Sequence, residues 1–273
     1  MRKIIPIIFL FSLLFGLNPG TAWGCTVFTM AQGKIVLFAG VENENARWLD
    51  KVACYLVPPN GEKKEYGYFY FYYNGYIAGG LNEKGLCFDI AGVPRHEADM
   101  GSRSPSNYPL TLLTKCATVD EAVALLKTDY WMGFPENHLM IADASGASVI
   151  LEWLKDKLYV YKKKPAYQVM TNYLITDPTC AYGPYPCPRE RRATDMLKSG
   201  KPTVKLFTGI LEAVKFAAFM PLYSYVYDLK AKKIYVYYST NYDQPITFDL
   251  MKELGKGKQS FVLAKLAAEG NHR

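Results

Sequence analysis

Residues 25–45 read CTVFTMAQGKIVLFAGVENEN, and this stretch predicts how the fold begins. β-Branched and aromatic side chains are frequent in 25–31 and 34–39, which favours two strands over a helix. Gln32-Gly33 lies between these segments and is typical of a tight hairpin turn. The fold is therefore expected to start with an antiparallel hairpin whose first residue is a cysteine.

The 24 residues ahead of Cys25 follow the three-part pattern of a secretory signal peptide. Arg2 and Lys3 are basic, an apolar run follows, and Ala22 and Gly24 supply the small side chains that signal peptidase prefers. The run is shorter than the ~20 apolar residues that cross a membrane as a helix. We therefore expect residues 1–24 to be removed, leaving no stable membrane span and a secreted or periplasmic protein.

The remaining residues 25–273 are expected to form one domain, because no linker or low-complexity tract interrupts them. The net charge is +7, but Lys and Arg are scattered apart from short clusters at 162–164 and 189–192. Nucleic-acid binding requires a continuous basic face and a recognisable module, so the sequence argues against it. It leaves the oligomeric state open, with a homo-oligomer among the options.

Strands and helices alternate in blocks along the chain. Thr118 and Glu121 are spaced like a helix-capping pair and mark the second half of the helical segment 110–127. Asn74-Gly75 is typical of a two-residue hairpin turn. This order predicts the α+β class, with two antiparallel sheets packed face to face and helices outside. Further strands are predicted at 52–57, 67–73, 86–90, 138–143, 148–153, 157–161, 168–171, 224–229, 234–239 and 246–250, and further helices at 189–198 and 207–219.

Six cysteines in an exported protein raise the question of disulfides. Cys180 and Cys187 flank a Gly/Pro-rich loop and are the best candidates for a bridge. Their spacing lacks the paired close ligands of a structural zinc site.

An N-terminal cysteine carries its own general base, because its α-amine lies within reach of the thiol. The amine titrates near ~7.7–8.0 and the thiol near ~8.5, so a proton passes between them close to neutral pH. A histidine partner is then unnecessary, and the chain has only His96, His138 and His272. His138 begins an apolar segment, which favours a structural role over catalysis.

Exported proteins that begin with cysteine are also often lipoproteins, in which the thiol and amine are acylated. Trp23 beside the cleavage point and Ala22 before it make a poor lipidation signal. A lipid-anchored binding protein without enzymatic activity nevertheless remains an alternative, as does an acyltransferase in which an amine replaces water as acceptor.

Several motifs, in order along nearly the whole mature chain, resemble the choloylglycine hydrolase family, which includes penicillin V acylases and bile salt hydrolases. The resemblance implies an N-terminal nucleophile hydrolase with a four-layer αββα sandwich, acting on a small-molecule linear amide without a metal or organic cofactor. The motifs are CTVF at 25–28, ENEN at 42–45 after Gly40, GLNEKGL at 80–86, IADASG at 141–146, VMTN at 169–172, PCPR at 186–189 and YSYVYD at 223–228.

This resemblance also implies residue roles. Cys25 would be the nucleophile, and its α-amine the general base and later the acid. The side-chain amide of Asn172 and a backbone N–H around Gly92 would stabilise the oxyanion. Arg189 would keep the surroundings of the cysteine electropositive and favour thiolate, although an arginine at a helix start also fits a surface salt bridge.

Two positions depart from the family pattern. Many relatives carry an aspartate after the first hairpin that orients the α-amine, and this chain has Asn43-Glu44-Asn45 there. Asn45 through its carbonyl oxygen, or Glu44 through its charge, would have to serve instead. Val41 stands where bile-acid-cleaving relatives have an arginine, so the sequence does not predict bile salts as substrates.

An aromatic run at 66–76 bears on the substrate. Alternation along a strand places half of these side chains on each face, so one set is expected in the core. The other set either lines a groove or packs under loops and helices. A groove would favour an apolar or aromatic acyl group.

Overall fold

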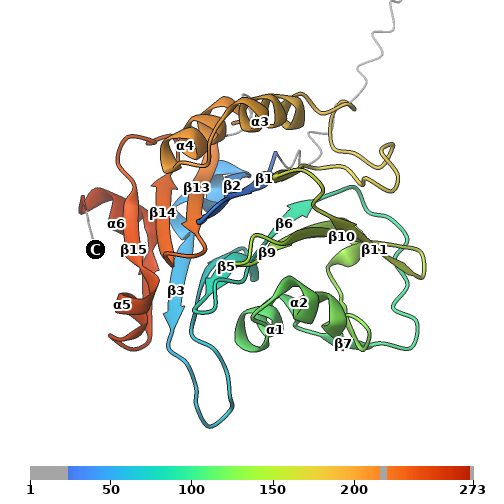
Figure 1. Ribbon diagram of the computed structural model, residues 1–273, viewed down its shortest axis with the longest axis horizontal. Helices are drawn as coiled ribbons and strands as arrows, with labels where there is room; N and C mark the ends of the chain where they lie inside the picture. The colour runs from blue at the N-terminus through green and yellow to red at the C-terminus, as the bar shows by residue number, and fades with distance from the viewer. Residues whose placement is uncertain (1–23, 216–219, 271–273) are drawn as a thin grey trace, which may run out of the picture.

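Two stacked antiparallel sheets form the centre of the computed structural model, which describes residues 24–215 and 220–270 (Figure 1). The six-stranded sheet has the order β12 (Tyr167–Met170), β1 (Thr26–Gln32), β2 (Ile35–Asn43), β13 (Pro221–Asp228), β14 (Lys233–Tyr238) and β15 (Ile246–Asp249). The eight-stranded sheet has the order β11 (Lys157–Lys162), β10 (Ser148–Leu154), β9 (Asn137–Ala142), β6 (Cys87–Gly92), β5 (Tyr76–Asn82), β4 (Tyr68–Tyr73), β3 (Ala53–Val57) and β16 (Gln259–Val262). A short parallel pair, β7 (Ser104–Ser106) and β8 (Asp129–Trp131), lies apart from both.

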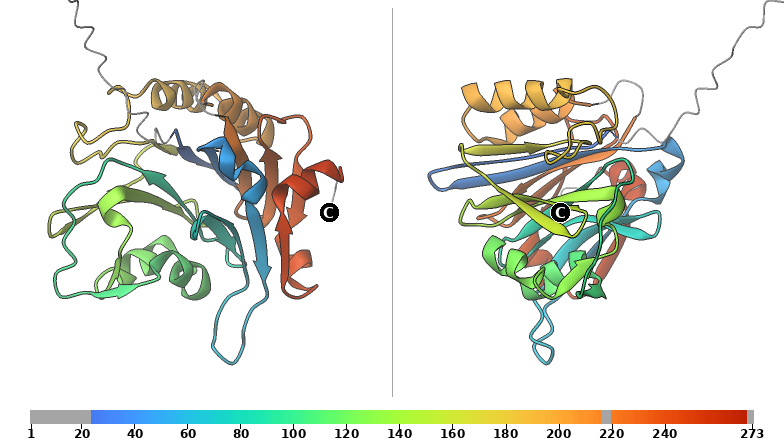
Figure 2. Two further views of the ribbon diagram at one scale, coloured as in Figure 1. Left: turned by 180° about the vertical axis from the view of Figure 1, so that it is seen from behind. Right: turned by 90° about the vertical axis from the view of Figure 1, so that its right-hand side faces the viewer.

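Helices cover the outer face of each sheet, which gives the predicted four layers (Figure 2). Helices α3 (Pro188–Ser199) and α4 (Val204–Ala213) lie on the six-stranded sheet, and α1 (Tyr108–Lys115) and α2 (Val119–Leu125) on the eight-stranded one. The α+β sandwich is therefore confirmed. Shorter elements complete the described chain: 3-10 turns η1 (Ala46–Lys51) and η2 (Phe134–Glu136), and helices α5 (Leu250–Leu254) and α6 (Leu263–Ala268).

Strand alternation explains why three apolar layers form. In β1, Val27 points into the layer between the sheets, whereas Phe28 points outward and meets Phe207 of α4 with ring centroids 4.9 Å apart. On the other side, Phe88 of β6 packs outward with Leu112 of α1. Burying each such side chain fully contributes about 1.5–3 kcal/mol, so these interfaces hold the four layers together.

The predicted hairpins form with small shifts. Gln32 pairs with Ile35, so Gly33-Lys34 is the turn between β1 and β2. Between β4 and β5, Asn74 and Gly75 have φ angles of 52° and 88°, the left-handed values that a two-residue type I′ turn requires.

The helical segment 110–127 divides into α1 and α2. Thr118 caps α2 by accepting from the backbone N–H of Glu121, whose side chain reaches back to the backbone of Thr118. This is the capping box that the sequence predicted. Of the helix predicted at 207–219, α4 ends at Ala213, and 216–219 lie outside the described residues.

The expected bridge between Cys180 and Cys187 is absent: both of these described residues are free thiols. The Cys180 thiol donates to the carbonyl oxygen of Pro94 at 3.3 Å, while Cys187 is the N-cap residue of α3. The side chain of Cys180 thus contacts the segment near Pro94, whereas Cys187 begins α3.

The aromatic run divides by strand face as expected. Phe69, Phe71 and Tyr73 are buried between the sheets. On the opposite face, Tyr70 stacks on Tyr55 at 4.9 Å and packs against the α1 and α2 layer, so most of the second set serves packing. Tyr72 lines a surface hollow of about 240 Å³ beside α1, and Tyr68 lines another of about 470 Å³.

Of the predicted signal peptide, residues 1–23 lie outside the described part of the chain, and Gly24 lies inside it. Within the described ranges, the helices are too short or too polar for any to cross a bilayer.

Candidate active site

Cys25 lies at the entrance to β1 with its side chain directed into the layer between the sheets. The β1–β2 register places it directly opposite Glu42, in a ladder that continues from Thr26 and Val41 to Gly24 and Asn43. The thiol is 1% exposed with Gly24 still attached, and Sγ lies 3.4 Å from Oε2 of Glu42.

Arg189, in the first turn of α3, connects the separate parts of this region. Its guanidinium donates to the backbone oxygens of Gly24 and Cys25, the latter at 2.5 Å, and to Oγ1 of Thr26 at 2.9 Å. Its other terminal nitrogen donates to Oδ1 of Asn172 at 2.9 Å. Burial lowers the pKa of Arg189, but the planar fork is satisfied by four acceptors, which suits a buried cation.

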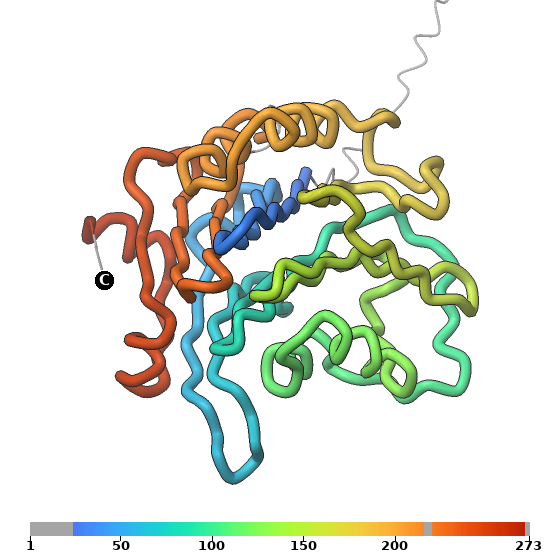
Figure 3. Tube along the Cα trace, viewed as in Figure 1, coloured from blue at the N-terminus to red at the C-terminus, as the bar shows by residue number. Residues whose placement is uncertain are grey.

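Asn172 reaches the site because it follows β12, which pairs with β1 along the edge of the six-stranded sheet. Figure 3 shows the blue β1 trace beside the segment near residue 170, although the two are far apart in sequence. Nδ2 of Asn172 donates to the carbonyl oxygen of Gly92 at 2.8 Å. Gly92 thus meets Asn172 through its carbonyl, and the oxyanion role of a nearby backbone N–H stays a prediction.

The peptide bond predicted to be cleaved is itself held in place. Nδ2 of Asn43 donates to the carbonyl oxygen of Gly24 at 2.7 Å, and Arg189 donates to the same oxygen. The N–H of Gly24 in turn donates to the carbonyl of Asn43 at 3.2 Å. Arg189 therefore holds both Gly24 and Cys25, the two residues joined by this bond, and Asn43 also holds Gly24.

The contacts of Asn45 and Glu44 are local while Gly24 is attached, and their predicted roles toward the α-amine stay predictions. Oδ1 of Asn45 accepts from the N–H of Arg47 at 3.0 Å and caps η1. Oε1 of Glu44 accepts from the N–H of Asn45 at 2.9 Å. The described contacts of both side chains serve the local turn.

Two buried acids that the sequence reasoning missed lie close to Cys25. Glu42 accepts from the hydroxyl of Tyr73 at 3.0 Å as well as from the thiol. Asp89, on the facing strand β6, accepts from the hydroxyl of Tyr225 and from its neighbour's backbone N–H. The missed signal was strand alternation: extending the inward positions Val36, Phe38 and Gly40 along β2 reaches Glu42.

Burial and mutual repulsion change the pKa values of these two acids. Burial raises the pKa of Glu42 to about 7, against hydrogen bonds from Tyr73 and Cys25 that lower it. Burial and the charge of Glu42 raise the pKa of Asp89 well above its usual range.

The Cys25 thiol, with Gly24 attached, is held protonated. Burial, then Glu42 and Asp89, raise its pKa well above the ordinary value, and Arg189 lowers it by less. The electropositive setting expected from Arg189 is therefore outweighed, and the thiol needs a base to become a nucleophile.

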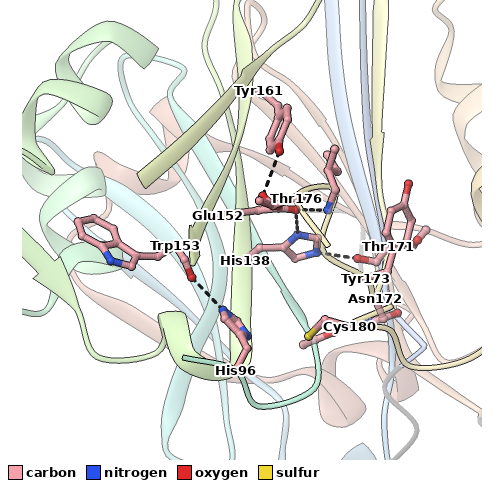
Figure 4. A network of polar contacts seen from close by, with 12 residues as sticks. His96, His138, Glu152, Trp153, Tyr161, Thr171, Asn172, Tyr173, Thr176 and Cys180 are labelled. Carbon is pink, nitrogen blue, oxygen red and sulfur yellow. Dashed lines mark hydrogen bonds and ion pairs between the residues drawn. The ribbon is translucent and has the colours of Figure 1, made fainter. Parts of the chain in front are cut away.

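His138 belongs to a buried network that supports the Asn172 segment (Figure 4). Its Nδ1 lies 3.2 Å from Oε1 of Glu152, and its Nε2 lies 2.6 Å from the carbonyl oxygen of Thr171. Both partners accept, which fits a doubly protonated ring. Glu152 also accepts from the backbone N–H groups of Ile175 and Thr176 at 2.7 and 2.9 Å. The structure agrees with a structural role for this histidine.

His96, the other described histidine, lies between the carbonyl oxygens of Pro94 and Trp153 at 3.1 and 2.9 Å. His272 lies outside the described residues.

A family model for linear amide C–N hydrolases of the choloylglycine hydrolase family matches residues 67–179. This segment of the chain is therefore similar to the choloylglycine hydrolase family. The members of that family are linear amide C–N hydrolases. The matched segment contains Gly92 and Asn172, whereas Cys25 and Arg189 lie outside it.

Solved structures of the same fold cover most of the chain. Penicillin V acylase from Agrobacterium tumefaciens is 19% identical with a TM-score of 0.66, covering 88% of this chain and 91% of its own. Two variants of conjugated bile acid hydrolase from Clostridium perfringens are 18% and 20% identical with TM-scores of 0.63 and 0.65; they cover 86% and 87% of this chain and 96% and 97% of their own. No curated protein matches the chain.

Proposed function

We propose that this chain is a member of the choloylglycine hydrolase family and an exported N-terminal cysteine amidohydrolase. Opening of the Gly24–Cys25 bond would give Cys25 a free α-amine beside its thiol. The amine then takes the thiol proton while Sγ attacks the carbonyl carbon of a linear amide. The amine of the substrate leaves with that proton, a thioester forms on Sγ, and water hydrolyses the thioester to the acid.

The observation that carries this proposal is the set of contacts made by Arg189. One guanidinium is bound to Gly24, Cys25 and Asn172, which are the cleavage point, the nucleophile and the oxyanion donor of the proposed mechanism. The NH₂ group of Asn172 has two hydrogens, of which one is donated to Gly92. We assign the other to the tetrahedral oxyanion.

For the substrate, we propose an apolar or aromatic acyl group. The support is the aromatic lining of the inner layer near Cys25, where Tyr73 and Tyr223 are buried and lie 6.3 Å apart between ring centroids. Val41 packs outward with the α3 and α4 layer, and the chain lacks an arginine at this position. We therefore do not propose a bile-acid substrate.

The test is turnover of a panel of acyl amides by secreted protein whose intact mass has been measured. We expect a mass that starts at Cys25, hydrolysis of aromatic acyl amides, and loss of turnover in Cys25→Ala. Cys116→Ala, which alters a buried thiol next to α1, is the matched control and should retain turnover. Unchanged turnover in Cys25→Ala, or a diacylglyceryl mass on Cys25, would refute the proposal.

A further inference from the structure

Because this chain has Asn43-Glu44-Asn45 where many relatives have an aspartate, the acid that compensates the charge of the α-amine has to be identified. Moving a proton from Sγ to the α-amine creates an ammonium in a site enclosed by two sheets. A buried ammonium needs a compensating charge, because desolvation penalises an unpaired cation.

Glu42 is placed to supply this charge. It stands directly opposite Cys25 across β1 and β2, and among the described residues it is the acid that contacts the thiol. Tyr73 fixes Oε2 of Glu42 from the facing sheet, and Tyr76 donates to the hydroxyl of Tyr73 at 2.7 Å. The carboxyl group is thus oriented from three strands.

A second observation concerns the other oxygen of Glu42. Oε1 is buried and has no hydrogen-bond partner among the described residues. A buried acceptor without a hydrogen-bond partner destabilises the folded state. Cleavage of Gly24–Cys25 would add N–H donors to Cys25, the residue opposite Glu42. Oε2 of Glu44 is also buried without a described partner, so Glu44 is the rival that an experiment must separate.

We propose that Glu42 is the positioning residue of the nucleophile: its Oε2 orients Sγ of Cys25, and its charge stabilises the α-ammonium that forms during attack. The proton moves from Sγ to the amine and on to the leaving group, and Glu42 remains a carboxylate throughout. The inference rests on the proposed function, since it requires a free amine on Cys25.

Several titratable groups surround Glu42, and all of them contribute to the pH dependence of kcat/KM. Glu44 directly follows the strand of Glu42, and α3 contributes the charge of Arg189 next to Cys25. The facing groups are Cys25 at β1, Tyr73 on β4, Tyr76 on β5, Asp89 on β6 and Tyr223 on β13.

The experiment compares Glu42→Gln, Glu42→Asp and Glu44→Gln in mature protein with a verified N-terminal Cys25. For Glu42→Gln we expect kcat/KM to fall roughly tenfold to a hundredfold, as for loss of a charge-assisted hydrogen bond. Loss of the negative charge lowers the pKa of both the ammonium and the thiol. The acidic limb of kcat/KM against pH, and the pH midpoint of iodoacetamide alkylation, should therefore both move to lower pH.

Glu42→Asp should restore part of the rate and the wild-type pH limb, because it returns the charge. Glu253→Gln is the matched control, since Glu253 is an equally buried acid that contacts Lys256 at 2.6 Å near the opposite end of the domain. It should leave the pH profile unchanged.

The inference is overturned if Glu42→Gln lowers the rate without moving either pH profile, or if Glu44→Gln moves them and Glu42→Gln does not. Failure of the proposed function looks different: Cys25→Ala would then retain turnover. The two failures are distinguishable because the first leaves Cys25 essential.

Discussion

Asn172 is predicted to act on the transition state more than on substrate binding. Removing its amide in Asn172→Ala should lower kcat by ~10²–10³ with a smaller change in KM, as expected for an oxyanion donor. Steady-state kinetics on an aromatic acyl amide measure this. Asn241→Ala, at an exposed position, should behave as wild type, and a change confined to KM would contradict the assignment.

The substitution Arg189→Lys tests whether a positive charge alone is sufficient for activity at this position. Arg189→Lys keeps the charge but loses the planar fork that reaches four acceptors. Losing two charge-assisted hydrogen bonds should lower kcat/KM by roughly a hundredfold or more. Arg191→Lys, at an exposed position on the same helix, is the control. Equal rates for the two variants would show that the fork is dispensable.

Cys25, Asn172 and Arg189 could be proposed from the sequence, whereas Glu42 could not, and the two outcomes have different reasons. The first three lie in motifs whose residue types suggest chemistry. The predicted strand 34–39 ended too early, whereas β2 extends to Asn43, so the inward position of Glu42 was not recognised. Asp89 was missed for a different reason: it lies within the predicted strand 86–90, but its partner Tyr225 is brought to it only when the two sheets stack.

Two further strands escaped prediction, one because of its glycines and one because its pairing partner is distant in sequence. Strand β5 contains Gly79-Gly80, residues that usually weaken a strand, yet β4 and β6 flank it on both sides. A Cβ on Gly80 would lie 2.6 Å from the carbonyl oxygen of Phe69, so close packing of strands explains the glycine there. Strand β16 forms only by pairing with β3, some 200 residues earlier in the chain.

The segment that carries Asn172 depends on the His138–Glu152 pair. His138→Ala removes the ion-pair partner of the buried Glu152 and leaves it only the hydrogen bonds from Ile175 and Thr176, which should cost about 3–5 kcal/mol of unfolding free energy. Denaturant titration measures this. The cost of Glu152→Gln should be smaller in the His138→Ala background than alone, because the two residues share one interaction. Additive effects would show that the pair is not coupled.

Buried acids between the sheets make the stability of the whole molecule depend on pH. The pKa of Glu42 is about 7 in the folded chain with Gly24 attached, against 4.5 as reference. A carboxyl whose folded pKa is raised contributes stability below its unfolded pKa and loses it as pH rises through the folded value. Chain that retains Gly24 should therefore lose up to about 3 kcal/mol between roughly pH 4.5 and 7.

Thermal or urea unfolding of a form that retains Gly24 checks this dependence. Glu42→Gln should flatten the slope between those pH values. Glu152 acts with the opposite sign: burial raises its pKa, but the hydrogen bond and charge of His138, together with hydrogen bonds from Thr176 and Ile175, outweigh burial and bring the pKa below its usual range. Its contribution is present above the unfolded pKa and is lost as pH falls through the folded value, so acid unfolding should begin there. A Glu42→Gln slope equal to that of wild type would contradict the role of Glu42 in this window.

The four-layer sandwich brings the start of β1, the segment after β12 and the first turn of α3 to one point, where we expect the covalent chemistry to take place. The most direct measurement is mass spectrometry of mature protein quenched during turnover of an aromatic acyl amide, followed by peptide mapping. We predict an acyl group on an N-terminal peptide that begins with Cys25, and its release by hydroxylamine as expected of a thioester. Full turnover by protein that still carries residues ahead of Cys25, or an acyl group mapped to another residue, would contradict the account.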